Sequence, residues 1–157
     1  LQGVPQVVGI IETTPQAKKL RIRQGDDLIR RTKKIISMLR DLHSKYDVQL
    51  IVSELPHGSQ NAKAAVMIGV VTGIVTTMGQ LYAVPVEFYS EADAKKCIFN
   101  THKVSKDEMV TAMKKRFEKS IGFMRTKKAQ EAIADSMAIY CVAEKESEIL
   151  KFLQKSE

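Results

Sequence analysis

The sequence predicts an α/β fold in which the strands of a buried sheet alternate with helices. Short apolar runs of strand-like composition recur along the chain, and longer segments with helical periodicity separate them. Such alternation is typical of a sheet whose strands are joined by right-handed helical crossovers. The chain has 157 residues, enough for a substantial core, and we expect a single domain over residues 1–157.

Three segments are expected to be strands. Residues 6–13 (QVVGIIET) and 48–54 (VQLIVSE) are apolar and rich in β-branched side chains, and the second ends in a carboxylate. Such apolar runs are typical of parallel strands that are covered on both faces. Residues 81–89 (LYAVPVEFY) form the third segment. Its Pro85 indicates a sheet edge or a strand end, because proline cannot donate a hydrogen bond to a neighbouring strand.

Five segments are expected to be helices, at residues 25–46, 60–79, 90–97, 105–120 and 127–154. The fourth begins at Ser105 and has Glu108 three residues later, the pattern of a capping box. The second is rich in alanine and glycine, so we expect a buried helix whose glycines, Gly69 and Gly73, allow a neighbour to approach closely. A membrane helix is the alternative for this segment, but Lys63, several threonines and insufficient length disfavour it.

The chain is basic, with a formal net charge of +7 and a pI of about 9.4. A basic surface favours a polyanionic partner such as nucleic acid, although many basic proteins bind none. The basic side chains of two predicted helices are expected to follow a phosphate backbone: Arg30, Arg31, Lys33, Lys34, Lys114, Lys115 and Arg116. Both cysteines, Cys97 and Cys141, are expected to be free thiols, which fits a reducing cytoplasm.

Asp135 lies in an almost wholly apolar helical stretch, AIADSMAIY at 132–140. Burying a carboxylate is costly unless a cation or a hydrogen-bond partner compensates its charge. Glu131 lies four residues earlier on the same helix face, and two like charges at this spacing repel unless a cation lies between them. Magnesium and manganese prefer such oxygen ligands, so we expect a divalent metal site. A salt bridge to a neighbouring lysine, or an N-capping role, is the alternative for Asp135.

Glu54 ends an apolar strand, and open parallel sheets bind ligands beyond the carboxyl ends of their strands. A solvated acid at a strand–loop junction is the alternative, and Glu12, which also ends a predicted strand, is a weaker candidate. With Asp135 and Glu131, Glu54 suggests phosphodiester hydrolysis with two metal ions. The sequence has no Gly-rich phosphate loop with a following lysine, no Cys/His metal spacing and no Gly-x-Ser-x-Gly elbow.

Three stretches of the chain resemble the RuvC family of Holliday-junction resolvases: IVSELPHGSQNAKAAVMIGVVTG at 51–73, VPVEFYSEADAKKCIFNTHKVSKDEMVTAM at 84–113 and AQEAIADSMAIY at 129–140. The resemblance implies a ribonuclease-H-like mixed sheet flanked by helices. It also implies that Glu54 is the second catalytic acid and Asp135 the last. Lys95 and Lys106 match two lysines that act near the scissile phosphate, where a cation stabilises developing charge. His57 stands where cellular resolvases place an aromatic residue that stacks on DNA.

The chain departs from the family pattern in two further ways. The family's first strand carries an Asp in a motif that is not found here, and the chain begins at Leu1. We therefore expect one or more upstream strands to be missing, and the chain as given to be inactive without that Asp. The acid or histidine that the family often has three residues before its last Asp is Ala132 here, with Glu131 as the nearest replacement. These departures suggest a divergent member of the family, encoded or domesticated by a phage.

The resulting hypothesis is an endonuclease that cuts four-way or other branched DNA with magnesium or manganese, using two ions. Four-way junctions are two-fold symmetric, so a homodimer is expected, and the helix at 60–79 is a candidate for its interface. We expect no membrane association, and the cytoplasm of a bacterium or a phage-infected bacterial cell as the location. The alternatives are a related nuclease acting on RNA–DNA hybrids or flaps, and a nucleic-acid-binding module without catalysis.

Overall fold

The computed structural model describes residues 5, 7–56, 58, 61–117 and 126–155. The chain divides into two compact units, which we call the sheet unit, with residues 1–10, 50–57 and 85–157, and the helix-pair unit, with residues 11–49 and 58–84. The fold is of the mixed α/β class, as the sequence predicted, although most of its described residues in regular structure are helical. A single domain over residues 1–157 stays a prediction.

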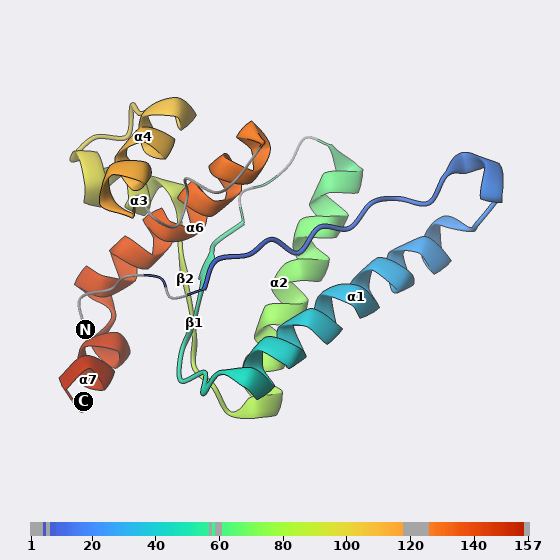
Figure 1. The fold of residues 1–157 in the computed structure, drawn as a ribbon, viewed down its shortest axis with the longest axis horizontal. Coiled ribbons are helices and arrows are strands. Elements are labelled where there is room, and N and C mark those ends of the chain that lie inside the picture. The colour runs from blue at the N-terminus through green and yellow to red at the C-terminus, as the bar shows by residue number, and fades with distance from the viewer. Residues whose placement is uncertain (1–4, 6, 57, 59–60, 118–125, 156–157) are drawn as a thin grey trace. The chain divides into compact units, whose positions relative to one another are not determined.

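The sheet unit is built on two parallel strands, β1 (Ile51–Glu54) and β2 (Val86–Tyr89), which run side by side in Figure 1. Ile51 pairs with Val86 at the start of the ladder, and Glu54 pairs with Tyr89 at its end. Pro85 lies just before β2, where its carbonyl accepts a 2.9 Å hydrogen bond from the Ile51 amide. Since the strands are parallel and in this register, their carboxyl ends meet at the same edge.

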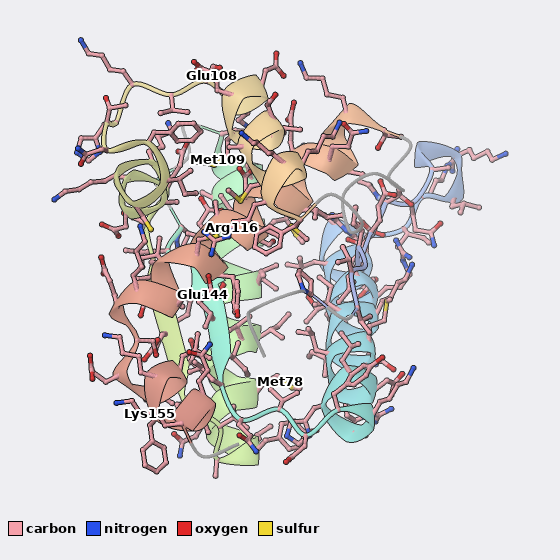
Figure 2. All side chains as sticks on the ribbon, turned by 60° about the vertical axis from the view of Figure 1, so that its left-hand side comes forward. Met78, Glu108, Met109, Arg116, Glu144 and Lys155 are labelled. Carbon is pink, nitrogen blue, oxygen red and sulfur yellow. The ribbon has the colours of Figure 1, made fainter. Side chains whose placement is uncertain are left out.

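Helix α6 (Lys127–Glu146) forms the centre of the sheet unit's core. It packs against both strands and against α3 (Glu91–Phe99) and α4 (Lys106–Arg116). Its buried face meets Met109 and Met113 of α4, and eight of its own residues are buried: Ile133, Ala134, Met137, Ala138, Ile139, Cys141, Val142 and Ala143. At the surface, Arg116 of α4 donates to Glu144 of α6 at 2.6 Å (Figure 2).

Capping boxes fix where α3 and α4 begin. Ser90 and Asp93 exchange hydrogen bonds at the start of α3, and Ser105 and Glu108 do the same at the start of α4. The second box is the one that the sequence predicted. Each box satisfies backbone N–H groups that the first helical turn leaves without partners. The first residues of α3 and α4 therefore have defined positions.

The last predicted helix is interrupted at Ser147, so the expectation of one helix over 127–154 is wrong. The backbone of Ser147 is extended between α6 and α7 (Glu148–Lys155). Its buried hydroxyl donates to Glu87 of β2 at 3.0 Å and accepts from the Leu150 amide at 3.0 Å. Tyr89 donates to the other Glu87 oxygen, and burial and Glu87 together raise the pKa of Tyr89 to about 12. The Ser147 hydroxyl thus caps the start of α7, while the Ser147 amide still donates to the Ala143 carbonyl at 2.9 Å.

The helix-pair unit contains α1 (Gln24–Lys45), α2 (Ala62–Tyr82) and a short 3₁₀ turn, η1 (Lys18–Leu20). Ile35 of α1 is buried together with Ile74 and Met78 of α2. The His43 ring stacks on Tyr82 with centroids 4.0 Å apart, so it packs between the helices. A small apolar cluster and one ring stack thus join the pair.

Helix α2 is mostly exposed, so the expectation of a buried helix is wrong for the part of the molecule that the structure describes. Only Ile74, Met78 and Gly79 of this helix are buried, whereas Val66 is 54% and Leu81 72% exposed. A side chain added at Gly69 or Gly73 would meet no atom within 4 Å, so no described neighbour makes the expected close approach. An apolar composition predicts that a helix is buried, but it does not identify the surface that packs against the helix.

Length does not exclude a membrane span for α2, contrary to the sequence argument. The helix has 21 residues, and an 18-residue window within it has a mean hydropathy of 1.7. This is weak evidence for a membrane, because core helices of soluble proteins meet the same criterion.

The strand predicted at residues 6–13 is wrong, because its described residues form no regular structure. Residues 12–14 are instead held by cationic side chains of α1. The Lys34 ammonium donates to the Glu12 carbonyl at 3.0 Å, and Arg31 donates to the Thr13 hydroxyl at 3.1 Å. A strand requires a neighbour to complete its hydrogen bonds. No described strand supplies one here, so local contacts to α1 prevail over the β-branched composition.

Candidate active site

A small cavity lies at the carboxyl edge of the two parallel strands. Glu54 is the last residue of β1, and its partner Tyr89 is followed by Ser90 and then by Glu91, the first residue of α3. Open parallel sheets place their ligand sites at this edge. The cavity is lined by four elements and the residue before α4, and its residues are Glu54, Glu91, Ala94, Lys95, Ser105, Lys106, Met109, Asp135, Ala138 and Ile139.

The cavity has a volume of about 20 Å³. Roughly 10–15 Å³ is the space that one water molecule requires, so a water or a bare cation fits, whereas a phosphodiester does not. Substrate would therefore lie over the mouth of the cavity rather than inside it. Its charged walls combine three carboxylates with two ammonium groups, which leaves one negative charge in excess when all five are ionised.

Asp135 projects from the central helix α6 into this cavity and is half-buried. Its helix neighbours Ala134 and Ala138 are almost fully buried, so apolar surface surrounds the base of its side chain. Burial is the main reason that the pKa of Asp135 lies above its ordinary value of 3.8; Lys106 opposes the shift, and Glu91 and Glu131 add to it. A desolvated carboxylate among other acids gains from a nearby cation. The apolar sequence around Asp135 predicted this environment.

Two lysines place positive charge on the same walls. Lys95 of α3 is 22% exposed, and its ammonium lies 2.8 Å from the Glu91 carboxylate. Lys106 is the first residue of α4 and follows the capping Ser105. Both lysines lower the pKa of Asp135, although burial prevails. The structure therefore brings Glu54, Asp135, Lys95 and Lys106 together from distant parts of the sequence.

Glu131, the third acid proposed from the sequence, lies one turn before Asp135 on α6. It is half-buried and is not among the residues that line the cavity. Its charge reaches the site, since it raises the pKa of Asp135. The structure thus shows an electrostatic link between Glu131 and Asp135 rather than a shared cavity wall.

The expected DNA-binding residues are engaged to different degrees. Lys114 is half-buried and donates to Gln130 at 2.7 Å, whereas Lys115 is exposed on α4. In the helix-pair unit, Arg30 pairs with Asp27 at 2.8 Å, and the Lys34 ammonium donates to the Glu12 carbonyl at 3.0 Å. His57 lies outside the described residues.

Glu91 and Ser105 are cavity residues that the sequence argument did not assign to the site. Ser105 was recognised only as a helix cap, and Glu91 was passed over in favour of Lys95 four residues later. Two signals were present for Glu91: it lies two residues after the end of a predicted strand, and an acid four residues before a lysine forms a favourable pair on a helix. A search for acids just after each strand would have found it.

The donor set suits a magnesium or manganese ion in part. Glu54, Asp135 and Glu91 offer the hard oxygen ligands that these ions prefer. Among residues 5, 7–56, 58, 61–117 and 126–155, however, no three Asp, Glu, His or Cys side chains lie close enough to hold a metal together. Magnesium commonly keeps several waters and uses one or two carboxylates. Glu54 and Asp135 fit that mode of binding.

Fold and site together define an α/β protein whose acidic, lysine-flanked cavity at a strand edge suits a divalent cation and an anionic substrate. The family model "Crossover junction endodeoxyribonuclease RuvC" matches residues 9–142. The chain therefore belongs to the RuvC family. No curated protein sequence matches it.

Two solved structures of the RuvC protein of Thermus thermophilus are similar to the chain. One is 16% identical, with a TM-score of 0.59, and the match covers 73% of this chain and 69% of that one. The other is the same protein in complex with a Holliday junction substrate; it is 14% identical, with a TM-score of 0.59, and the match covers 75% and 71%. At this identity the likeness shows a shared fold.

Proposed function

We propose that the chain is a structure-selective endonuclease that hydrolyses phosphodiesters of four-way or other branched DNA with magnesium or manganese. Membership of the RuvC family and the likeness to a resolvase structure bound to a Holliday junction support this proposal. The same relationship supports a ribonuclease-H-like arrangement of the fold. One observation carries the proposal: Glu54 and Asp135 lie on the walls of one cavity with Lys95 and Lys106.

In this mechanism, Glu54 and Asp135 would hold a divalent cation at the cavity, and the cation would supply activation of a water molecule and stabilisation of the leaving oxygen of the phosphodiester. The ammonium groups of Lys95 and Lys106 bind the phosphate over the cavity mouth and offset the charge that develops on it. If two ions act, Glu131 would help to hold the second.

The basic residues outside the cavity bind the DNA backbone in this proposal. Lys114 and Lys115 contribute from the last turn of α4 in the sheet unit, and Arg30 and Lys34 contribute from the helix-pair unit. Contacts of this kind fix the position of DNA and make affinity fall steeply with salt. His57 is proposed to contact a base near the junction. The protein acts in the cytoplasm of a bacterium or a phage-infected bacterial cell.

The test is cleavage by variants of the full-length protein in which each acid is replaced by its amide. Glu54→Gln and Asp135→Asn are each expected to reduce junction cutting by about 100-fold or more, the range typical of losing one main electrostatic contact. Junction binding is expected to persist, because binding depends mainly on basic residues. Asp41→Asn is the matched control, since Asp41 is exposed on α1 and pairs with Arg40 at 3.5 Å. Junction cutting that survives both acid replacements rules out this site.

Substrate comparison separates the proposal from its alternatives. Preferred cutting of junctions over RNA–DNA hybrids and linear duplex supports the proposal, and preferred cutting of hybrids supports the related ribonuclease-H-type activity. The lack of a three-ligand group in the described part of the chain favours a non-catalytic binding module as second candidate. Tight junction binding without metal-dependent cutting would establish that module.

A further inference from the structure

The ion pair between Glu91 and Lys95 lies on the cavity wall. Glu91 Oε1 is 2.8 Å from Lys95 Nζ, and the two residues are one helical turn apart on α3. Both side chains are partly shielded, with exposures of 43% for Glu91 and 22% for Lys95. An acid placed four residues before a lysine is the favourable order on a helix. The pair is therefore better held than the freely exposed pairs of the surface, which contribute little.

We propose that Glu91 is a positioning residue that holds the Lys95 ammonium on the cavity wall, where it meets the scissile phosphate of bound DNA. The inference rests on the proposed nuclease function. It gives Glu91 the role of orienting Lys95, which differs from the cation-binding role proposed for Glu54 and Asp135. The capping box at Ser90 and Asp93 fixes the start of α3, so the Glu91 side chain begins from a defined backbone position. Lys95 is thereby oriented before substrate arrives.

Lysine needs such a partner because its side chain is a compact charge on a flexible four-carbon stem. Two other positions are open to it: extension into solvent, or contact with the half-buried carboxylate of Asp135. Lys95 already acts on Asp135 electrostatically. Direct contact would place the ammonium where the divalent cation is proposed to bind. Glu91 keeps Lys95 near the phosphate and leaves Asp135 open to the cation.

The geometry favours this role over metal binding by Glu91 itself. The Glu91 carboxylate has its close contact with Lys95, and the described residues contain no group of three acidic or histidine side chains placed around one ion. A carboxylate that pairs with an ammonium contributes less of its charge to a metal. The 2.8 Å contact with Lys95 therefore favours a positioning role for Glu91.

The first experiment compares single-turnover junction cleavage and metal-free junction binding for Glu91→Gln, Lys95→Ala, the double variant and wild type. Glu91→Gln is expected to cut about tenfold more slowly, as for the loss of one orienting contact. The double variant is expected to cut no more slowly than Lys95→Ala, because Glu91 acts through Lys95. Metal-free binding is expected to be unchanged or tighter in Glu91→Gln, since one negative charge has left the site.

Asp107→Asn is the matched control for these variants. Asp107 also lies in the first turn of a helix and pairs with a lysine, Lys127, at 2.9 Å, but the pair is exposed and neither residue lines the cavity. Its loss is expected to leave cleavage unchanged. The proposal would be overturned if Asp107→Asn slowed cleavage as much as Glu91→Gln does. It would also be overturned if the double variant cut more slowly than Lys95→Ala, by the factor that Glu91→Gln alone produces.

The second experiment needs no activity. An amine-reactive ester labels lysines in the folded, metal-free protein, and mass spectrometry measures the rate at each site. Lys95 is expected to react more slowly than its exposed neighbour Lys96, and Glu91→Gln is expected to accelerate Lys95 severalfold without affecting Lys96. Equal Lys95 rates in wild type and Glu91→Gln refute the inference. An inactive wild type that keeps the labelling difference refutes the proposed function instead.

Discussion

Asp135 shows how a single side chain can serve a site at the expense of the fold. Burial above all raises the pKa of its carboxyl group above the ordinary value, so ionisation of Asp135 costs folding free energy. The penalty exists above the raised pKa of the folded state. It disappears below the ordinary carboxyl pKa, where both the folded and the unfolded chain are protonated. A residue that costs stability at working pH is typical of a functional position.

The metal-free Asp135→Asn protein is accordingly expected to melt a few degrees higher than wild type at about pH 7. The difference should shrink as the pH falls toward the ordinary carboxyl value of 3.8, because the wild-type side chain then becomes neutral as well. Thermal unfolding followed by circular dichroism in EDTA over this pH range measures it. A lower melting temperature of Asp135→Asn at neutral pH would show that Asp135 stabilises the fold.

At the scale of elements, the N-terminal ends of α3 and α4 determine where the ammonium groups of Lys95 and Lys106 lie in the cavity. Lys106 is the first residue of α4 and directly follows its cap, and Lys95 lies in the second turn of α3, after the cap at Ser90. The amide hydrogen bonds of these boxes hold the helices at their N-terminal ends. Hydrogen bonding of Glu108 to the Ser105 side chain and backbone lowers the pKa of Glu108, so the box at α4 is complete above the acid range.

Ser105→Ala is expected to lower the free energy of unfolding by about 1 kcal/mol, the usual cost of losing such a cap. Ser105→Asp should restore most of it, because aspartate caps helices equally well. Urea unfolding measures both variants, with Ser44→Ala on the exposed surface of α1 as a control. An unchanged midpoint for Ser105→Ala would show that tertiary packing alone fixes the start of α4.

Several elements could be predicted from the sequence because their signals are local. The β1 and β2 segments, the cap at Ser105 and the polar Asp135 in an apolar helix each carry their information within a few residues. The break at Ser147 could not be predicted in this way, since Glu87, which binds its hydroxyl, lies 60 residues away. The failed strand at 6–13 and the exposed helix α2 depend on a partner surface that composition does not specify.

At the scale of the whole molecule, α2 offers an apolar face that the described chain leaves uncovered. The face contains small and apolar residues at helical spacing, namely Ala62, Val66, Gly69, Gly73, Thr77 and Leu81, all of them exposed. A two-fold symmetric substrate suits a symmetric dimer, and an isologous helix contact would bury this face on both copies. We therefore propose that the homodimer expected from the sequence would use α2, whose glycines would permit close approach of the partner.

Gly73→Leu tests this assembly without damaging the protomer. A Cβ atom added at Gly73 would meet nothing within 4 Å, and leucine favours helix more than glycine does, by up to about 1 kcal/mol. The variant should fold at least as stably as a monomer but self-associate more weakly, as sedimentation velocity measures. Gly25→Leu is the control, because Gly25 of α1 is equally open. Identical self-association of Gly73→Leu and wild type would exclude an interface at this glycine.

The central position of α6 restricts how this protein can change over evolutionary time. The helix presents core residues on one side and Asp135 toward the cavity, so both depend on the same rotational setting. Inserting or deleting one residue between Ala134 and Val142 would turn one part of the helix by about 100° relative to the other. Asp135 and the buried residues of α6 could then no longer face the cavity and the hydrophobic core at the same time. Length differences among relatives should therefore fall outside this helix, while substitutions within it conserve volume.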